Sequence, residues 1–231
     1  MNVLIIFAHP EPKSFNGAMK DVAVQTLQKA GHSVQVSDLY TMRFDAVGDE
    51  RDFVETKGKP FFNYLDEQVR ATNESLFIPE LKQEMDKLIW ADLVIFQFPL
   101  WWFSLPAVMK GWIDRVFAMG FAYDVKRNFQ NGVFSGKRSM LALTTGSPEM
   151  LFRDDAKLGD MGQILHHIQW GMLRYVGMDV MAPFVAFGAA RATPEQRTAY
   201  LNDYRLRLLA IESTAPIELR AAHSMRAPAS S

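Results

Sequence analysis

Three short runs of almost uninterrupted apolar residues constrain the fold more than any other feature of this sequence. They occupy residues 2–8 (NVLIIFA), 93–98 (LVIFQF) and 139–145 (SMLALTT). Short runs rich in branched residues indicate strands, and strands that are apolar on both sides must be covered on both faces. Such burial is typical of a parallel sheet between two layers of helices. The sequence therefore predicts a central parallel sheet.

Helical patterns separate and follow these strands. Residues 33–39 and 180–187 supply two more strands, and apolar residues three and four positions apart predict five helices. Ser14 and Thr193 stand where helix N-caps are expected, and Gly31 and Gly177 stand where helices should end. Five strands alternating with five helices predict an α/β fold with a doubly wound parallel sheet. We expect the flavodoxin-like strand order 2-1-3-4-5, with helices on both faces.

The chain is expected to form one domain over residues 1–213. The interval 40–78 is too long for an ordinary connection, which predicts an insertion with interface or cofactor contacts. Residues 214–231 are rich in Ala, Ser and Pro and have no periodicity, which predicts a loose C-terminal tail.

Composition narrows the possible functions. The 25 Lys and Arg residues balance 26 Asp and Glu residues, so neither nucleic acid nor an anionic membrane surface is an expected partner. Because the chain has no cysteine, redox chemistry must come from a bound cofactor. The most apolar stretch, residues 93–109, contains Pro99 and Pro106 and is not expected to span a membrane. No signal-peptide core precedes the first strand, which predicts a cytoplasmic location.

Loops at the carboxyl edge of the sheet are the expected ligand site, since doubly wound folds bind ligands there. The first loop, residues 9–17, leads into a helix that Ser14 can cap, with Lys13 nearby, and suits a phosphate as well as an ordinary turn. The second, residues 99–106, holds three aromatic residues, which favours stacking on a planar ligand over packing in the core. The third, residues 144–148 (TTGSP), is small enough for a flat ring to approach its backbone.

Two further groups of polar residues are assigned no catalytic role. His166 and His167 are adjacent, point to different sides of a helix and cannot chelate a metal as an i,i+4 pair does. Lys110, Asp114 and Arg115 are expected to form a solvated charged helix face.

Residues 3–20 (VLIIFAHPEPKSFNGAMK), residues 91–123 (ADLVIFQFPLWWFSLPAVMKGWIDRVFAMGFAY) and the LTTG turn together resemble the NAD(P)H:quinone oxidoreductase (DT-diaphorase) family. The resemblance extends to about Pro216. It implies a flavodoxin-like homodimer that holds FAD in preference to FMN, with each active site at the dimer interface. It also implies NAD(P)H as co-substrate and a quinone or similar planar acceptor.

The resemblance carries site roles over to matching positions. Most of the matching residues occupy positions that contact the phosphates, the ribose or the isoalloxazine of the flavin. They are His9, Ser14, Phe15, Asn16, Pro99, Leu100, Trp102, Phe103, Thr144, Thr145 and Gly146. Asn63 and Asp114 match positions near the adenine, and their match is less close. Tyr123 and Tyr175 correspond to aromatics at the mouth of the substrate pocket, facing the partner's flavin, with Trp102 and Phe103 as the opposite wall.

The sequence departs from the family at several of these positions. Phe152 and Leu158 stand where well-studied members have a Tyr and a His beside the flavin, so no catalytic side chain is assigned. Val125 replaces a second aromatic after Tyr123, and Trp101 replaces a common Gln. The preference between NADH and NADPH therefore stays open.

The resulting hypothesis is a FAD-dependent NAD(P)H dehydrogenase (quinone) that works by two-electron, ping-pong hydride transfer. One alternative is an FMN-binding regulatory subunit, because ancillary subunits of bacterial potassium-efflux transporters resemble the same stretch. A flavodoxin-type electron carrier is the other alternative, although near-neutral charge disfavours it.

Overall fold

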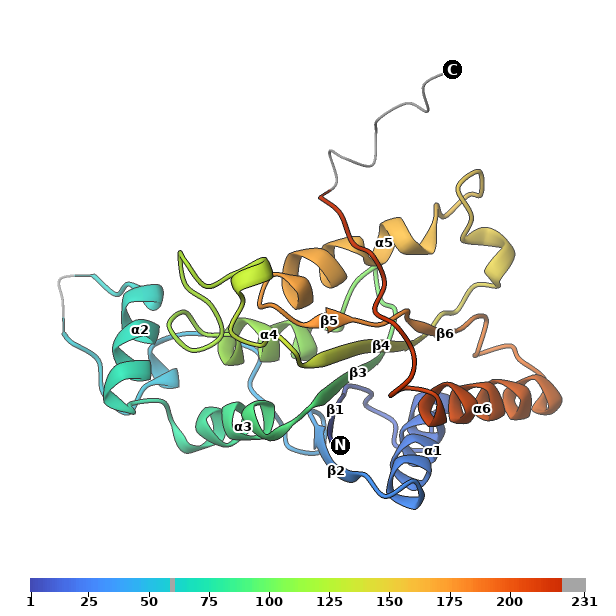
Figure 1. Ribbon diagram of the computed structural model, residues 1–231, viewed down its shortest axis with the longest axis horizontal. Coiled ribbons are helices and arrows are strands. Elements are labelled where there is room, and N and C mark those ends of the chain that lie inside the picture. Colours follow the sequence, from blue (N-terminus) through green and yellow to red (C-terminus); the bar gives the residue numbers. More distant parts are fainter. Residues whose placement is uncertain (59–60, 222–231) are drawn as a thin grey trace.

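The computed structural model describes residues 1–58 and 61–221 and shows a parallel sheet between two layers of helices (Figure 1). The strands lie in the order β2-β1-β3-β4-β5, and β6 also pairs with β4. All these pairings are parallel, which confirms the doubly wound, flavodoxin-like order that the sequence predicts. The strands are β1 (Asn2–Phe7), β2 (Ser33–Asp38), β3 (Leu93–Pro99), β4 (Arg138–Thr144), β5 (Asp179–Val180) and β6 (Phe184–Ala186).

Alternate side chains of the strands enter two hydrophobic clusters, one on each face of the sheet. Ile5 of β1 packs with α1 and α6, whereas the neighbouring Ile6 packs with α3, α4 and α5. Burial on both faces explains why β1, β3 and β4 are almost entirely apolar. The helices are α1 (Phe15–Lys29), α2 (Tyr64–Glu74), α3 (Pro79–Trp90), α4 (Ala107–Val116), α5 (Met161–Ile168) and α6 (Pro194–Leu209).

Both predicted N-caps form. The Ser14 hydroxyl accepts a hydrogen bond from the backbone N–H of Gly17 at the start of α1. Thr193 and Gln196 form a reciprocal capping box at the start of α6, with Pro194 in its first turn. These local signals therefore fix where the two helices of one face begin.

The prediction of one continuous strand over residues 180–187 is wrong. The structure divides it into β5 and β6, both paired with β4. Ser139 pairs with Val180 and Ala142 with Phe184, so the edge strand carries one extra residue between the two pairings. Pro183 lies in this interval and has no N–H to donate, which explains the break.

The predicted helix over residues 165–175 changes its geometry part-way. Regular α5 ends at Ile168, and a π-helical segment, Gln169–Arg174, continues it. Gly177 follows with a φ of 98°, in contact with the backbone of Gly132. The glycine stop is confirmed, but hydrophobic spacing alone did not reveal the wider turn.

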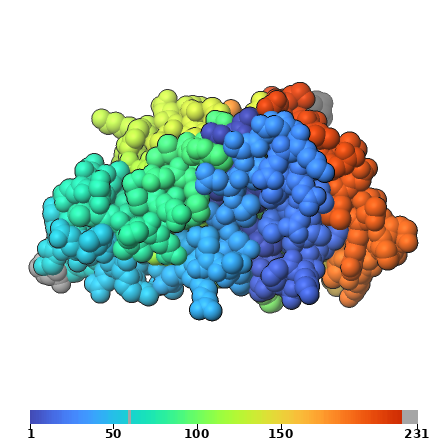
Figure 2. Space-filling model, turned by 90° about the horizontal axis from the view of Figure 1, so that it is seen from below, coloured from blue at the N-terminus to red at the C-terminus, as the bar shows by residue number. Residues whose placement is uncertain are grey.

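The insertion over residues 40–78 lies at the end of the molecule opposite α6 (Figures 1 and 2). It contains α2 and a short 3-10 turn, Glu50–Asp52. The prediction that this part of α4 is a solvated charged face is wrong for Arg115. Arg115 is 2% exposed and pairs with the buried Asp52 of the insertion at 2.7 Å. A partner 63 residues away in sequence makes that burial possible. Lys110 and Asp114 do form an exposed pair.

The described part of the C-terminal segment lies against the body of the protein. The backbone N–H of Ile217 donates to the carbonyl of Val180 at 2.8 Å, and Ile217 and Leu219 pack against a core cluster. The rest of the predicted tail, residues 222–231, lies outside the described residues. No helix in residues 1–58 or 61–221 is long and apolar enough to cross a membrane.

Candidate functional site

A cavity of about 550 Å³ opens where β1, β3 and β4 end, within the range of roughly 300–1,000 Å³ usual for ligand pockets. All three loops singled out in the sequence contribute to it. The cavity is lined by His9, Lys13, Ser14, Phe15, Asn16, Pro99, Leu100, Trp101, Thr144, Thr145, Gly146, Ala189, Ala190 and Arg197. The structure thus brings together nine of the flavin-contacting candidates; Trp102, Phe103, Asn63 and Asp114 are not among its lining residues.

One end of this cavity is built by the loop after β1. Glu11 donates its backbone N–H to Nδ1 of His9 at 3.0 Å, and Ser14 caps α1. Gly17 lets α1 start directly against the carbonyl of Pro12. Lys13 also lines this end, and a cation beside a helix N-terminus suits an anionic group.

Arg197 is a lining residue that the sequence analysis missed. It lies in the first turns of α6 and lines the same cavity as Lys13 because α6 packs beside α1. Its only sequence signal is a position shortly after the Thr193 cap, and this signal does not identify its neighbour across the cavity. Together, Lys13 and Arg197 give the cavity lining two positive charges that could face an anionic group.

A buried chain of hydrogen bonds runs under the cavity floor. Asn16 Nδ2 donates to Thr144 Oγ1 at 2.7 Å, and Gln97 Nε2 donates to the Asn16 carbonyl at 2.6 Å. Tyr204, whose burial raises its pKa, donates its hydroxyl to Gln97 Oε1 at 3.3 Å. The Asn16 Oδ1 atom is buried without a hydrogen-bond partner among the described residues. Because Asn16 lines the cavity, an unsatisfied acceptor lies directly beneath the cavity surface.

An aromatic hairpin borders the cavity. Trp101 and Ser104 exchange backbone hydrogen bonds at 3.2 and 3.0 Å around Trp102 and Phe103. These two residues have φ values of 50° and 60°. Consecutive left-handed residues are the geometry of a type I′ turn, which prefers Asn and Gly, so each bulky residue costs about 1–2 kcal/mol. The strained turn holds Trp102 95% exposed and Phe103 45% exposed.

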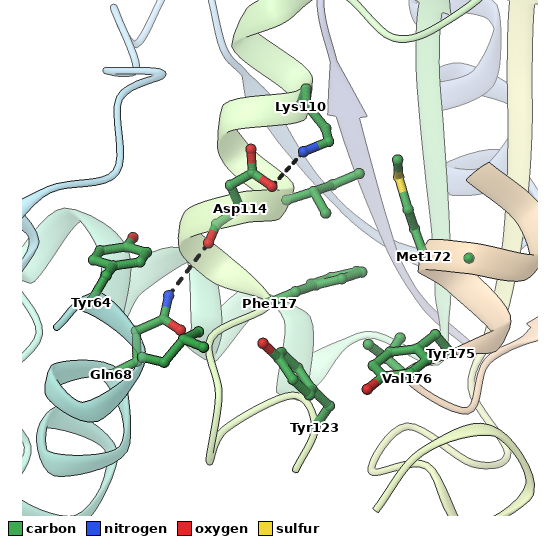
Figure 3. Close-up of a pocket in the computed structure, with 12 residues that line it drawn as sticks. Tyr64, Gln68, Lys110, Asp114, Phe117, Tyr123, Met172, Tyr175 and Val176 are labelled. Carbon is green, nitrogen blue, oxygen red and sulfur yellow. Dashed lines mark hydrogen bonds and ion pairs between the residues drawn. The ribbon is translucent and has the colours of Figure 1, made fainter. Parts of the chain in front are cut away.

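Tyr123 and Tyr175 lie together in a second cavity of about 520 Å³ (Figure 3). Their ring centroids are 5.5 Å apart, and burial raises the pKa of Tyr123. Gln68 from α2 orders this region, because its Nε2 donates to the Asp114 carbonyl and its Oε1 accepts from the N–H of Met119. Asp114 lines this cavity too, with its carboxylate paired to Lys110 at 2.5 Å (Figure 3).

Asn63 lines neither cavity. It caps α2, and its side-chain oxygen accepts a hydrogen bond from the N–H of Asp66 at 3.3 Å. The two cavities share no lining residue, so one copy of the chain does not bring Asn63, Asp114, Tyr123 or Tyr175 to the first cavity.

Phe152 and Leu158 give their region an apolar character. Phe152 is 7% exposed, with its ring centroid 5.5 Å from that of Phe187. Leu158 packs against the same core, and its N–H donates to the Leu151 carbonyl. Neither side chain can donate, accept or move a proton.

The lining of the first cavity fits a flavin nucleotide. It combines the cations Lys13 and Arg197, the N-terminus of α1 and the glycine turn at Gly146. A Cβ added at Gly146 would meet no atom within 4 Å, so space lies open above that turn. Small residues with free backbone groups allow a flat ring to approach closely.

Comparison with known proteins decides the family. A family model described as a flavodoxin-like fold matches residues 1–209. Ribosyldihydronicotinamide dehydrogenase (quinone) of Mus musculus is 41% identical over 216 residues, covering 93% of this chain and 94% of that protein. The chain belongs to the NAD(P)H:quinone oxidoreductase family. NAD(P)H dehydrogenase (quinone) 1 of Cavia porcellus is also 41% identical, over 93% of this chain and 78% of that protein.

A solved structure extends the likeness within the NAD(P)H:quinone oxidoreductase family to three dimensions. A Klebsiella pneumoniae protein assigned as a quinone reductase superimposes with a TM-score of 0.91 at 42% identity, over 95% of this chain and 88% of that one. The matched residues 1–209 include the linings of both cavities. The flavodoxin-like fold of the family implies a flavin cofactor.

Proposed function

We propose that this protein is an oxidoreductase that uses a bound flavin to transfer two electrons from NAD(P)H to quinones or similar planar acceptors. The observation that supports the proposal is the first cavity, where cationic side chains, a helix N-terminus, an open glycine turn and an aromatic hairpin meet at the carboxyl edge of the sheet. The names of the relatives, which are quinone dehydrogenases, support the same substrates. A single flavin-binding domain over residues 1–213 is part of the proposal. A cytoplasmic location stays a prediction from the sequence.

FAD, in preference to FMN, is the proposed cofactor. The loop after β1 and the N-terminus of α1 would hold the phosphates and ribose, and the loops after β3 and β4 would hold the ring system. The proposed contacts are His9, Ser14, Phe15, Asn16, Pro99, Leu100, Trp102, Phe103, Thr144, Thr145 and Gly146, with Arg197 added by the cavity lining. Asn63 and Asp114 are proposed at the adenine end.

A homodimer is proposed because the candidate residues fall into two groups in one copy. Asn63 and Asp114 lie away from the first cavity, and Tyr123 and Tyr175 line the second. A second copy that faces the first cavity with these residues would complete both the adenine end and the substrate pocket. Exposed apolar side chains on the insertion, Phe61 at 72% and Leu65 at 47%, are consistent with an interface there.

A bound flavin would supply hydride transfer, from NAD(P)H to the flavin and, after the oxidised nucleotide leaves, from the flavin to the quinone. This ping-pong cycle consumes one proton and yields a hydroquinone. The protein's own contribution is position and exclusion of water. Trp102 and Phe103 form one wall for a flat substrate, and Tyr123 and Tyr175 of the second copy form the other.

Backbone groups are proposed to stabilise negative charge on the ring system. Phe152 and Leu158 offer no hydrogen-bonding or ionisable side chain. The N–H groups of Gly146 and Ser147 are free of the sheet ladder and follow the end of β4 directly. Fixed dipoles at such a turn can take the role of a charged or hydroxyl side chain.

The alternative function is an FMN-binding regulatory subunit of a potassium-efflux transporter. The apolar pair of Phe152 and Leu158 favours it, since a regulatory subunit does not require polar side chains beside the ring. The 40–78 insertion, whose α2 shapes the second cavity, favours the enzyme.

Identification of the cofactor and its reduction test the proposed function. The purified protein is denatured to release its flavin, which is then identified by chromatography against FAD and FMN. The native protein is mixed with NADH or NADPH, followed by a quinone, while the visible absorbance of the oxidised flavin is recorded. Release of FAD, with bleaching by the nucleotide and recovery on adding quinone, is the expected result. FMN, or a flavin that neither nucleotide bleaches, would contradict the proposal and favour the regulatory subunit.

Replacement of Trp102 by alanine tests its proposed contacts with both the flavin and the substrate. Trp102 is 95% exposed at the tip of the aromatic hairpin. We expect kcat/KM for a quinone to fall about 10- to 100-fold, as for truncation of an aromatic anchor, and flavin binding to weaken as well. Trp102→Phe, which keeps the turn geometry and an aromatic face, is the control and should retain most activity. If Trp102→Ala kept both its flavin and its quinone turnover, the proposal that Trp102 belongs to the site would be wrong.

A further inference from the structure

A hydrogen bond joins the aromatic hairpin to α5. The Ser104 hydroxyl lies 3.1 Å from Nε2 of His167, and Nδ1 of the same ring lies 2.9 Å from the carbonyl oxygen of Ile164. A carbonyl can only accept, so Nδ1 carries the proton and donates to it. In the neutral ring Nε2 is then an acceptor, and the hydroxyl of Ser104 donates to it. Both ring nitrogens of His167 are therefore used.

The location of this hydrogen bond gives it a role beyond surface stability. The base of the hairpin is fixed, because Leu100 donates its N–H to the Thr144 carbonyl and Leu105 is buried. Its tip is strained by two left-handed aromatic residues, and neither Trp102 nor Phe103 belongs to the hydrophobic clusters of the described residues. Ser104 closes the turn, so a contact there opposes its relaxation.

We propose that His167 is a positioning residue, which acts through Ser104 to hold the Trp102–Phe103 turn in the conformation that receives a flat acceptor. The inference rests on the proposed function for the identity of the acceptor, whereas the mechanical role of the bond does not. His166, its neighbour, faces elsewhere: Nε2 lies 2.8 Å from the Arg220 carbonyl, and its ring stacks on Trp170. Adjacent histidines on α5 thus hold two different segments.

Hydrogen exchange measures the mechanical role directly. Deuterium uptake is followed by mass spectrometry in a peptic peptide that contains residues 100–105, whose Trp101 and Ser104 amides form the hairpin bonds. His167→Leu and Ser104→Ala should each accelerate exchange of these amides about 3- to 10-fold, the loss expected for one hydrogen bond. The double variant should exchange no faster than either single variant, since all three remove the same bond. His166→Leu is the matched control and should leave this peptide unchanged.

Activity and flavin binding complete the test. In His167→Leu, kcat/KM for a quinone should fall about 3- to 10-fold, in line with the exchange, while flavin Kd stays within about twofold because His167 does not line the first cavity. His167→Gln, whose side-chain oxygen can accept from Ser104, should recover part of both losses. Unchanged exchange in His167→Leu and Ser104→Ala would overturn the positioning role, whatever the activity. Faster exchange in a protein that holds no flavin or reduces no quinone would instead contradict the proposed function.

Discussion

Gly17→Ala is expected to weaken flavin binding about 10- to 100-fold, the effect of moving a binding group by about 1 Å. A Cβ at this position would lie 1.9 Å from the carbonyl oxygen of Pro12 and 2.9 Å from its carbon. Gly17 is held in the first turn of α1, so the loop after β1, which contains Pro12, must shift to make room for the Cβ. His9 and Lys13, which line the cavity on either side of Pro12 in the sequence, would move away from the place proposed for the flavin phosphates. Titration of the apoprotein with FAD and with FMN, followed by quenching of flavin fluorescence, gives the Kd.

Gly146→Ala is the matched control for this variant. Its added Cβ meets no protein atom within 4 Å, so its thermal unfolding should match that of the unmodified protein. Gly17→Ala should also lose about 1–3 kcal/mol of stability through overpacking. If Gly17→Ala kept an unchanged flavin Kd, the loop after β1 would not hold the phosphates. A loss of flavin affinity in Gly146→Ala without loss of stability would indicate close approach of the ring system to the turn after β4.

Local signals account for the parts of the fold that the sequence predicts. The central strands β1, β3 and β4 are recognisable because every side chain in them except that of Asn2 and that of Arg138 is buried. The caps at Ser14 and Thr193 involve partners only three residues away. The strand order follows from these elements together with the handedness of their connections. The three loops of the first cavity could be selected for the same reason, since the carboxyl ends of neighbouring strands meet at one edge.

Contacts between distant segments account for what the sequence did not predict. Arg115 occupies a helix position that looks like a surface charge in the sequence, and its burial depends on partners in the insertion, Asp52 and the carbonyl of Asp45. Arg197 reaches the first cavity through the packing of α6 beside α1. The left-handed geometry of Trp102 and Phe103 contradicts their own preferences and persists because the closure of the turn fixes it. The division of candidate residues between two cavities also required the three-dimensional arrangement.

Arg115→Met is expected to lower the free energy of unfolding by about 3–5 kcal/mol, the cost of leaving a buried carboxylate without its cation. Arg115 donates from Nε to Asp52 Oδ1 at 2.9 Å and from a terminal nitrogen to the Asp45 carbonyl at 2.6 Å. Asp52 is 1% exposed and, among the residues that the structure describes, would keep the hydroxyl of Tyr64 as its one side-chain donor. Urea unfolding should therefore show a lower midpoint with an unchanged slope.

Two comparison variants make this prediction specific to the buried pair. Lys110→Ala removes an exposed pair on the same helix and should change stability by less than about 1 kcal/mol. Adding Asp52→Asn to Arg115→Met removes the uncompensated charge and should recover part of the loss. Trypsin should cleave Arg115→Met faster at Arg51 or Lys57, because the ion pair holds the insertion to α4. If Arg115→Met unfolded at the same urea concentration as Lys110→Ala, the buried pair would not be what anchors the insertion, and the second cavity would owe its shape to the packing of α2 alone.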